Sequence, residues 1–188
     1  MQKEIEKMGI KIELLKWTKA YKTDLIELCN AADRTFLSNR MPYPYTEKDA
    51  DFWLDMVAEH DGKDGIFRAI CCDGKIVGNI SVEQKTDVQQ KDAEIGYLLQ
   101  TELRSKGIMT EAVQQIWRIA FRELGLLRIT GLVYAPNIAS RRVLEKNGFV
   151  LEGIMRQAIV KPGAIYDLCI YGKLAQAEQT ADEAQNYI

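Results

Sequence analysis

The sequence predicts a single-domain α/β protein, in the broad sense that includes α+β folds. Its 188 residues, 47% hydrophobic and 28% charged, suit one globular core. Apolar residues recur at helical spacing over Gly107–Leu124, with charged residues on the opposite side. Strand-like runs at Ile66–Cys72 and Lys75–Glu83 are joined by Asp73-Gly74, a two-residue hairpin signal. Strong helix and strand signals in one short chain exclude an all-α or all-β class.

The first half of the chain alternates between strand and helix signals. The stretch Arg40–Tyr45 contains two prolines, which exclude a helix interior. Directly after it, Thr46 and Asp49 have the spacing of a capping box, which marks the start of a helix. The elements expected before the hairpin are a strand at Ile10–Leu15, a helix after Thr18 with Leu25, Ile26, Leu28 and Cys29 on its apolar side, and a helix with Phe52, Trp53, Met56 and Val57.

The second half continues this alternation after a polar loop at Thr86–Lys91. Gly125 ends the long helix, and Asn147-Gly148 end a second helix that starts at Asn137. The expected strands of this half are Ala93–Leu99, Arg128–Tyr134, Phe149–Glu152 and Tyr166–Lys173. Because no linker interrupts the pattern, we expect one domain over residues 1–174 and a polar tail over 175–188.

Composition argues against several classes of function. A net charge of -2 and a pI near 5.6 provide no basic field for nucleic acid. The longest apolar stretches fall far below the roughly 20 residues of a membrane span. The charged N-terminus also lacks the apolar segment of a secretory signal. We therefore expect a cytoplasmic protein that binds neither nucleic acid nor membranes.

The cysteines and the single histidine carry no signal for a metal site. The cysteines lack Cys-x-x-Cys spacing and stand in apolar surroundings, which predicts buried, reduced thiols at Cys29, Cys71, Cys72 and Cys169. His60 stands in the polar stretch Glu59–Gly62, where we expect a solvated loop. Neither a metal ligand set nor a histidine-based nucleophilic mechanism is predicted.

The most informative local signal is the loop Arg104-Ser105-Lys106-Gly107-Ile108-Met109, which leads into the long helix. Successive backbone amides at a helix N-terminus suit a phosphate, because unpaired donors and the positive end of the helix dipole face the anion. Gly107 lets oxygen atoms approach the backbone, and Arg104 and Lys106 add positive charge. By itself the signal is weak, because one glycine between a strand and a helix is more often a plain turn. The loop matches neither nucleotide-binding glycine motif.

A second motif, Asn137–Phe149, makes the weak signal of this loop specific. In chain order, Glu94-Ile95-Gly96-Tyr97, Arg-x-x-Gly-x-Met-Thr-Glu-Ala and Asn-x-x-Ser-x-x-x-Leu-Glu-Lys-x-Gly-Phe resemble the GNAT acetyltransferases, specifically the RimJ/RimL-type branch that acetylates ribosomal-protein N-termini. The similarity runs from about Ile10 to Leu174, and as a set the motifs are specific. It implies the GNAT fold, a mixed, splayed sheet of about six to seven strands with helices on both faces.

The resemblance implies acetyl-CoA as the cofactor. Pantetheine would lie along the strand that ends at Leu98-Leu99-Gln100, and the pyrophosphate on the glycine loop. Asn137 would bond the pantetheine arm, and Ser140 would lie near its sulfur. The implied cofactor residues are Leu98, Leu99, Gln100, Arg104, Ser105, Lys106, Gly107, Ile108, Met109, Thr110, Asn137, Ser140, Arg142 and Lys146. Residue type alone equally makes Asn137 a plain helix N-cap and Arg142 a surface charge.

Acetyl transfer to an amine needs a neutral amine, a donor for the developing oxyanion, and an acid or water for the leaving thiolate. The resemblance implies that a backbone N–H near Leu98 binds the oxyanion. Ser140 is the candidate hydrogen-bond donor to the thiolate, and Glu94 is the nearest candidate base on the same strand as Leu98. Glu94 equally suits an outward strand position. The candidates for lining the acceptor pocket are Tyr43, Tyr45 and Trp53, although core packing explains Trp53 equally well.

Two residues depart from the family pattern. Leu144 stands where many GNAT enzymes have a tyrosine acid, and Ile159 stands where the ribosomal branch often has a glutamate. With reference pKa values of about 7.8 and about 10.4, roughly 14% of an α-amine but roughly 0.04% of a lysine is neutral near pH 7. We therefore expect an α-amine acceptor, such as a protein N-terminus or an amino acid. Small amines such as polyamines or drugs, and a weakened acyl-CoA-binding or regulatory protein, are the alternatives. Homodimer formation is left open.

Overall fold

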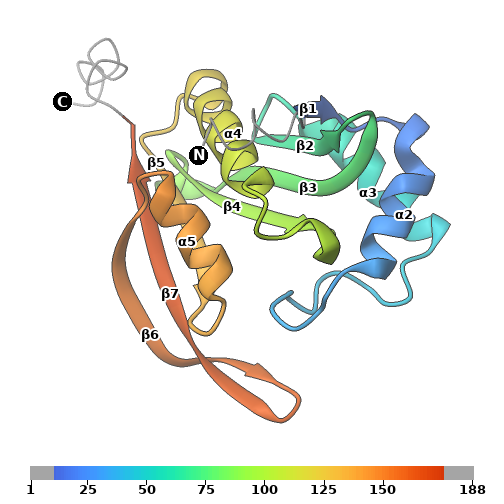
Figure 1. The fold of residues 1–188 in the computed structure, drawn as a ribbon. Helices are drawn as coiled ribbons and strands as arrows, with labels where there is room; N and C mark the ends of the chain where they lie inside the picture. Colours follow the sequence, from blue (N-terminus) through green and yellow to red (C-terminus); the bar gives the residue numbers. More distant parts are fainter. Residues whose placement is uncertain (1–10, 176–188) are drawn as a thin grey trace.

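In the computed structural model, which describes residues 11–175, one seven-stranded sheet runs through the protein (Figure 1). The strand order is β1-β2-β3-β4-β5-β7-β6, and only β4 and β5 are parallel neighbours. The strands are β1 Ile12–Lys16, β2 Gly65–Cys72, β3 Lys75–Gln84, β4 Asp92–Leu99, β5 Arg128–Tyr134, β6 Val150–Lys161 and β7 Ala164–Leu174. The sheet is mixed, as expected. The expected tail lies, apart from Ala175, outside the described residues.

Helices cover both faces of this sheet (Figure 1). α2 and α3 pack on β3 and β2 from one side, whereas α4 packs on β1, β2 and β3 from the other, with α5 beside it against β5. The helices are α2 Lys22–Ala31, α3 Glu47–His60, α4 Ile108–Leu124 and α5 Ile138–Lys146. Short 3-10 turns lie at Lys19–Tyr21, Asp87–Gln89 and Thr101–Leu103. Within residues 11–175, no helix has the length and apolar content needed to cross a membrane.

β2 shows why the sheet carries helices on both sides. Every residue of this strand is buried, and successive side chains point to opposite faces. Ile66 and Ile70 enter the larger core, which lies between the sheet and α4, while Phe67 and Ala69 enter the second core, which lies against α2 and α3. The predicted burial of the thiols is confirmed in these two cores, for Cys29, Cys71, Cys72 and Cys169.

β4 and β5 separate part-way along their length, and this separation makes room for a site. Their parallel pairing runs only from Asp92↔Arg128 to Ile95↔Gly131. β4 continues to pair with β3 as far as Leu99, and β5 continues to pair with β7 as far as Tyr134. Beyond Ile95 the two facing strand edges therefore have no strand partner on that side, which is the splay that the family resemblance implies.

The last two strands are longer than the sequence predicts. Strands were expected at Phe149–Glu152 and Tyr166–Lys173, but β6 and β7 form a long hairpin arm (Figure 1). Most β6 side chains are exposed, and its register shifts between Met155 and Ile159, where Gln157 has a φ of 53°. An exposed, bulged strand lacks the regular alternation that identifies strands in a sequence.

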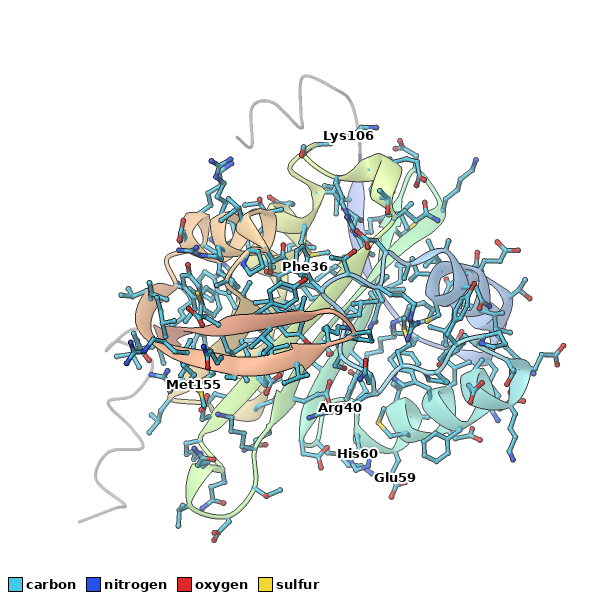
Figure 2. All side chains as sticks on the ribbon, turned by 90° about the horizontal axis from the view of Figure 1, so that it is seen from below. Phe36, Arg40, Glu59, His60, Lys106 and Met155 are labelled. Atoms are coloured by element: carbon cyan, nitrogen blue, oxygen red, sulfur yellow. The ribbon has the colours of Figure 1, made fainter. Side chains whose placement is uncertain are left out.

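α3 begins where the sequence predicts, but one side chain on it faces the other way. Thr46 caps the helix, because the Asp49 N–H donates to Thr46 Oγ1 at 3.4 Å and the Thr46 N–H donates to Asp49 Oδ2 at 2.8 Å. Phe52, one of the apolar residues expected in this helix, is 76% exposed. His60 is the last residue of α3 rather than a loop residue, and its Nδ1 lies 2.8 Å from Asp64 Oδ1 at the edge of the molecule (Figure 2).

Candidate functional site

A cavity of about 770 Å³ occupies the splay between β4 and β5. Its volume is typical of a small-molecule site. The predicted cofactor residues that line it are Leu98, Leu99, Arg104, Ser105, Gly107, Ile108, Met109, Thr110, Asn137, Ser140, Arg142 and Lys146. Gln100 and Lys106 do not line it: the Gln100 N–H donates to Val77 O at 2.9 Å, and Lys106 lies at the outer edge of the molecule (Figure 2).

The open edge of β4 presents backbone hydrogen-bonding groups to this cavity. In the antiparallel pairing with β3, successive residues of Gly96–Leu99 alternate in direction. One residue turns both its N–H and its C=O toward β3, and the next turns both away from it. Because β5 has separated by this point, the groups that face away have no strand partner. An extended ligand that carries amides can hydrogen-bond to such an edge as an added strand does.

The loop before α4 has the backbone geometry of an anion site. Ser105 and Gly107 both adopt the left-handed region, with φ values of 62° and 81°. Turns of this kind can bring successive N–H groups together around one anion. Gly107 is the N-cap of α4, and no side chain caps this helix, whereas Thr46 caps α3 and Asn137 caps α5. The first-turn amides of α4 are therefore free of a capping side chain and suit an incoming anion.

Arg104 is held by a carboxylate that the sequence does not suggest. Its Nη1 lies 2.8 Å from Oδ2 of Asp33, which belongs to the segment after α2. Hydrogen bonds from the Thr35 hydroxyl, from Arg104 and from the Thr35 amide hold the pKa of Asp33 well below its ordinary value. Both Asp33 and Arg104 line the cavity, so their ion pair ties the anion loop to the segment after α2.

α5 and its N-cap bring four predicted residues to the same cavity, namely Asn137, Ser140, Arg142 and Lys146. The Ser140 N–H donates to Asn137 Oδ1 at 3.2 Å, which confirms Asn137 as a helix N-cap. The side-chain NH₂ of Asn137 is still available to donate to a ligand. Arg142 and Lys146 lie further along the same helix and also line the cavity. Two cations on this wall of the cavity make it suitable for a polyanion.

Ser140 contacts a residue that sequence reasoning did not single out. Tyr97 Oη lies 2.7 Å from Ser140 Oγ and 3.2 Å from Ser140 O, and both residues line the cavity. Burial raises the pKa of Tyr97, so its hydroxyl stays protonated. The available signal was its place in Glu94-Ile95-Gly96-Tyr97, but a strand motif does not show which helix the tyrosine meets.

Glu94 and Ser140, the two predicted catalytic residues, lie on the same cavity. Glu94 is partly buried on β4, and this burial raises the pKa of its carboxyl, while the charges of Arg40 and Lys85 act in the opposite direction. A carboxyl whose pKa is raised toward neutrality in a cleft suits a general base. Within residues 11–175, no cluster of His, Cys, Asp and Glu side chains is arranged to hold a metal ion.

Leu144 fills the base of the splay. Its side chain is fully buried, and a Cβ added at Gly131 would lie only 2.6 Å from Leu144 Cδ1. A side chain at position 131 of β5 would therefore have to displace Leu144. Leu144 also lines the cavity, so the position that holds a tyrosine in many GNAT enzymes here presents an apolar surface. Ile159 pairs with Tyr166 in the β6–β7 arm.

The aromatic residues predicted for the acceptor pocket do not line the cavity. Tyr43 is 66% exposed. Tyr45 is buried in the second core, where its hydroxyl donates to Asp49 O at 3.4 Å. Trp53 packs edge-on against Trp17 with ring centroids 5.5 Å apart. Tyr45 lies in the second core and Trp53 packs against it, and their role at an acceptor pocket stays a prediction.

Phe36 supplies the aromatic wall that the sequence did not locate. Its ring centroid lies 6.3 Å from that of Tyr134 and 6.3 Å from that of Tyr166. Phe36 and Tyr134 line the cavity, and Phe36 lies near the centre of the view in Figure 2. An aromatic residue in an irregular segment belongs to no periodic pattern, which is why the sequence alone did not place it.

Comparison with known proteins decides the family. The profile of the acetyltransferase (GNAT) domain matches residues 11–150. The chain belongs to the GNAT acetyltransferase family.

Two solved structures share the GNAT fold of this chain. The ribosomal L7/L12 α-N-protein acetyltransferase RimL, in complex with coenzyme A, aligns with a TM-score of 0.77 at 23% identity over 87% of this chain and 93% of RimL. The microcin C7 self-immunity acetyltransferase MccE, in complex with acetyl-CoA and AMP, aligns with a TM-score of 0.75 at 23% identity over 88% of this chain and 93% of MccE.

Several GNAT relatives come from Bacillus subtilis. The probable N-acetyltransferase YjcK is 44% identical over 95 residues, which are 50% of this chain and 51% of YjcK. The putative ribosomal N-acetyltransferase YdaF is 37% identical over 110 residues, 58% of this chain and 60% of YdaF. The chain thus spans about half the length of YjcK. The uncharacterized N-acetyltransferase YokL is 30% identical over 158 residues, 82% of this chain and 86% of YokL.

Proposed function

We propose that this GNAT protein transfers the acetyl group of acetyl-CoA to a primary amine, preferably an α-amine such as a protein N-terminus or an amino acid. The observation that carries the proposal is the cavity between the splayed strands, which extends from the open edge of β4 to the uncapped start of α4. An edge for amides beside a site for phosphates matches a ligand that has an amide-bearing arm and a pyrophosphate. The coenzyme A complex of RimL supports the same choice of ligand.

Each wall of the cavity has a proposed role toward acetyl-CoA. The Gly96–Leu99 edge pairs with the pantetheine amides, and the NH₂ group of Asn137 donates to the same arm. The glycine loop holds the pyrophosphate with the first-turn amides of α4. Arg142 and Lys146 are nearer the adenosine phosphates. Arg104 reaches the pyrophosphate when it exchanges Asp33 for a phosphate oxygen.

The proposed reaction is a direct attack by the amine on the thioester in a ternary complex. Glu94, with its raised pKa, takes the proton of the amine directly or through water. A backbone N–H near Leu98, on the open edge of β4, stabilises the oxyanion. Ser140 donates a hydrogen bond to the leaving thiolate. These roles require no covalent enzyme intermediate.

The preference for an α-amine follows from the small number of candidate general bases at the site. Ile159 offers no carboxylate, so Glu94 is the one predicted base on the cavity. Near pH 7 roughly 14% of an α-amine is neutral, against roughly 0.04% of a lysine side chain. YdaF, a putative ribosomal N-acetyltransferase, also favours a protein acceptor. An acceptor that is already partly neutral suits a site with a single candidate base.

A second candidate function is an acyl-CoA-binding or regulatory protein without turnover. The observation in its favour is Leu144, whose fully buried, apolar side chain occupies the position of a tyrosine acid in many GNAT enzymes. Small amines such as polyamines or drugs are further candidate acceptors for an active enzyme. All of these alternatives share the same cofactor site, so binding is tested before catalysis.

The binding test is a thermal shift with acetyl-CoA. At 100 times the Kd, the ligand adds about 2.7 kcal/mol, which raises the Tm of a domain of this size by about 5–10 °C. Gly107→Glu abolishes the shift, because it places bulk and negative charge at the phosphates. Gly74→Glu is the matched control, since Gly74 shares the φ of 81° but lies in the β2–β3 turn with open space around it. A well-folded wild-type protein that shows no shift overturns both candidate functions.

The catalytic test is the release of free CoA thiol. The acceptor panel contains short peptides with free N-termini, amino acids, polyamines, and lysine peptides with blocked N-termini. Faster release with free N-termini or amino acids supports the proposal. Cofactor binding without release from any acceptor favours the binding protein, and release confined to blocked lysine peptides contradicts the α-amine preference.

A further inference from the structure

We propose that Tyr97 is a positioning residue, which holds Ser140 so that the serine proton points at the sulfur of the leaving thiolate. The inference rests on the proposed function, because it assumes that the acetyl-CoA sulfur lies beside Ser140. Its basis is the hydroxyl pair that joins β4 to α5 across the splay, with 2.7 Å between Tyr97 Oη and Ser140 Oγ. Both residues line the cavity.

The two hydroxyl groups of Tyr97 and Ser140 can arrange their protons in two ways. A tyrosine or serine hydroxyl has one proton to donate and can also accept. Tyr97 Oη reaches two acceptors, Ser140 Oγ at 2.7 Å and Ser140 O at 3.2 Å. Without a sulfur nearby, Ser140 can donate to Tyr97 while Tyr97 donates to the carbonyl oxygen. When Ser140 turns its proton toward a thiolate, Tyr97 can turn its own proton to Ser140 Oγ, at the usual O–H···O distance.

Tyr97 is suited to this exchange because it is fixed and neutral. It lies on β4 opposite Ile80 of β3 and packs against the larger core. Burial raises the pKa of its hydroxyl, so Tyr97 stays protonated and can donate a hydrogen bond. A donor on a strand locks the rotation of Ser140 more tightly than one on a loop.

The backbone of Ser140 is anchored as well. Its N–H donates to Asn137 Oδ1 at 3.2 Å, and its carbonyl lies within reach of Tyr97. The serine belongs to the first turn of α5, where the helix dipole favours negative charge. The hydroxyl of Ser140 is therefore the one part of the residue that can still rotate toward a ligand.

The chemical step balances without any charge on Tyr97. The amine nitrogen forms a bond to the acetyl carbon, and the carbon–sulfur bond breaks with its electron pair on sulfur. Ser140 donates a hydrogen bond to that sulfur while Tyr97 donates to Ser140 Oγ. The amine proton leaves to Glu94 or water, and the thiolate takes up a proton from water.

A purely structural role for Tyr97 has a matched control in Tyr171. Tyr171 Oη accepts from Arg141 Nε at 3.0 Å and donates to Glu145 Oε1 at 2.8 Å. It therefore ties α5 to β7 by two hydrogen bonds without touching Ser140. If Tyr97 only anchored α5, Tyr171→Phe and Tyr97→Phe would have the same effects.

The test compares CoA with desulfo-CoA, which lacks the sulfur, by isothermal titration calorimetry near pH 9. Wild-type protein is expected to bind CoA about 10-fold more tightly, the size of one hydrogen bond to a charged group. Ser140→Ala abolishes this preference, and Tyr97→Phe reduces it to less than about 2-fold, whereas Tyr171→Phe retains it. No acceptor amine is needed, and desulfo-CoA binding reports whether each variant still forms the site.

Kinetics provide a second readout once an acceptor is found. Tyr97→Phe is expected to lower kcat about 10-fold, while its KM for acetyl-CoA stays within about 2-fold of the wild-type value. The double variant Tyr97→Phe/Ser140→Ala is expected to be no slower than Ser140→Ala alone. Equal effects of Tyr97→Phe and Tyr171→Phe, or an unchanged CoA preference in Tyr97→Phe or Ser140→Ala, overturn the inference. Wild-type protein that binds neither CoA nor desulfo-CoA overturns the proposed function, and the inference falls with it.

Discussion

Among single residues, Glu94 has an environment that works against its charge. It lies on β4 between Glu83 of β3 and Thr130 of β5, and burial raises its pKa despite the opposing charges of Arg40 and Lys85. With a raised pKa, the folded protein binds this proton more tightly than the unfolded chain does. The stability that Glu94 contributes is therefore fully present at a pH below its pKa in the unfolded chain. It is lost as the pH rises through its pKa in the folded protein. Residues that cost stability in this way are common in functional sites.

Glu94→Gln is expected to raise stability and lower activity together. At pH 7 its Tm should exceed that of wild-type protein, and the difference should vanish below about pH 4, where an unfolded glutamate is also protonated. Loss of the base should slow thiol release at least about 10-fold. Thermal melts from pH 3 to 8 and the CoA-release assay measure both effects. Glu102→Gln, an exposed position outside the cavity, is the control.

The outcomes separate the two roles of Glu94. An unchanged rate of thiol release would contradict its role as a base. A Tm at pH 7 equal to or below that of wild-type protein would contradict the effect of burial on its carboxyl.

At the scale of secondary-structure elements, the starts of α3, α4 and α5 differ in their capping, while α2, which continues directly from the 3-10 turn Lys19–Tyr21, also has no side-chain cap. α3 has the Thr46 capping box, and α5 has the Asn137 side chain. α4, the longest helix among the described residues, starts at a left-handed Gly107 without a side-chain cap. A cap contributes typically about 1 kcal/mol. Packing on the larger core stabilises α4 without one, and its start is left open for a ligand.

α3 provides a test of which helix face carries the packing. Leu54 is buried in the second core, whereas Phe52 is 76% exposed on the same helix. Leu54→Ala should lower the free energy of unfolding by about 2–5 kcal/mol, because it leaves a cavity. Phe52→Ala should change it by less than about 0.5 kcal/mol. Urea denaturation measures both, and a larger loss for Phe52→Ala than for Leu54→Ala would show that the helix faces the other way.

At the scale of the whole molecule, two cores on opposite faces of one sheet hold the protein together. The buried alternation of β2 links them, because neighbouring residues of this strand enter different cores. The cysteines are divided between the cores, with Cys29 and Cys71 in the second core and Cys72 and Cys169 in the larger one. Thiol exposure therefore reports on both halves of the fold.

Thiol labelling is expected to follow global unfolding. Burial raises the pKa of Cys29 and of Cys72 to about 11, so only about 0.1% of either is thiolate at pH 8. Native protein should react slowly with a thiol reagent at pH 8, and denaturant should release all four thiols. Acetyl-CoA should slow native labelling further, because it stabilises the folded state. Rapid labelling of a thiol in native protein would show that one core opens independently.

The sequence by itself determined the elements that depend on neighbouring residues. The α4 periodicity, the Asp73-Gly74 hairpin and the Thr46 cap are encoded over a few positions, and the structure has all three. The family motifs likewise located the loop that lines the cavity. The sequence missed the length of β6, because an exposed, bulged strand leaves no periodic pattern.

Tertiary structure alone decided which of these residues meet. The Tyr97–Ser140 pair joins residues 43 positions apart, and the Arg104–Asp33 pair joins residues 71 positions apart. It also buried Tyr45, which had been a candidate for the acceptor pocket, and placed Phe36 on the cavity. Local periodicity cannot encode contacts between residues so far apart in the chain. The Tyr97–Ser140 pair, for example, forms because β4 and β5 separate and α5 packs beside the gap.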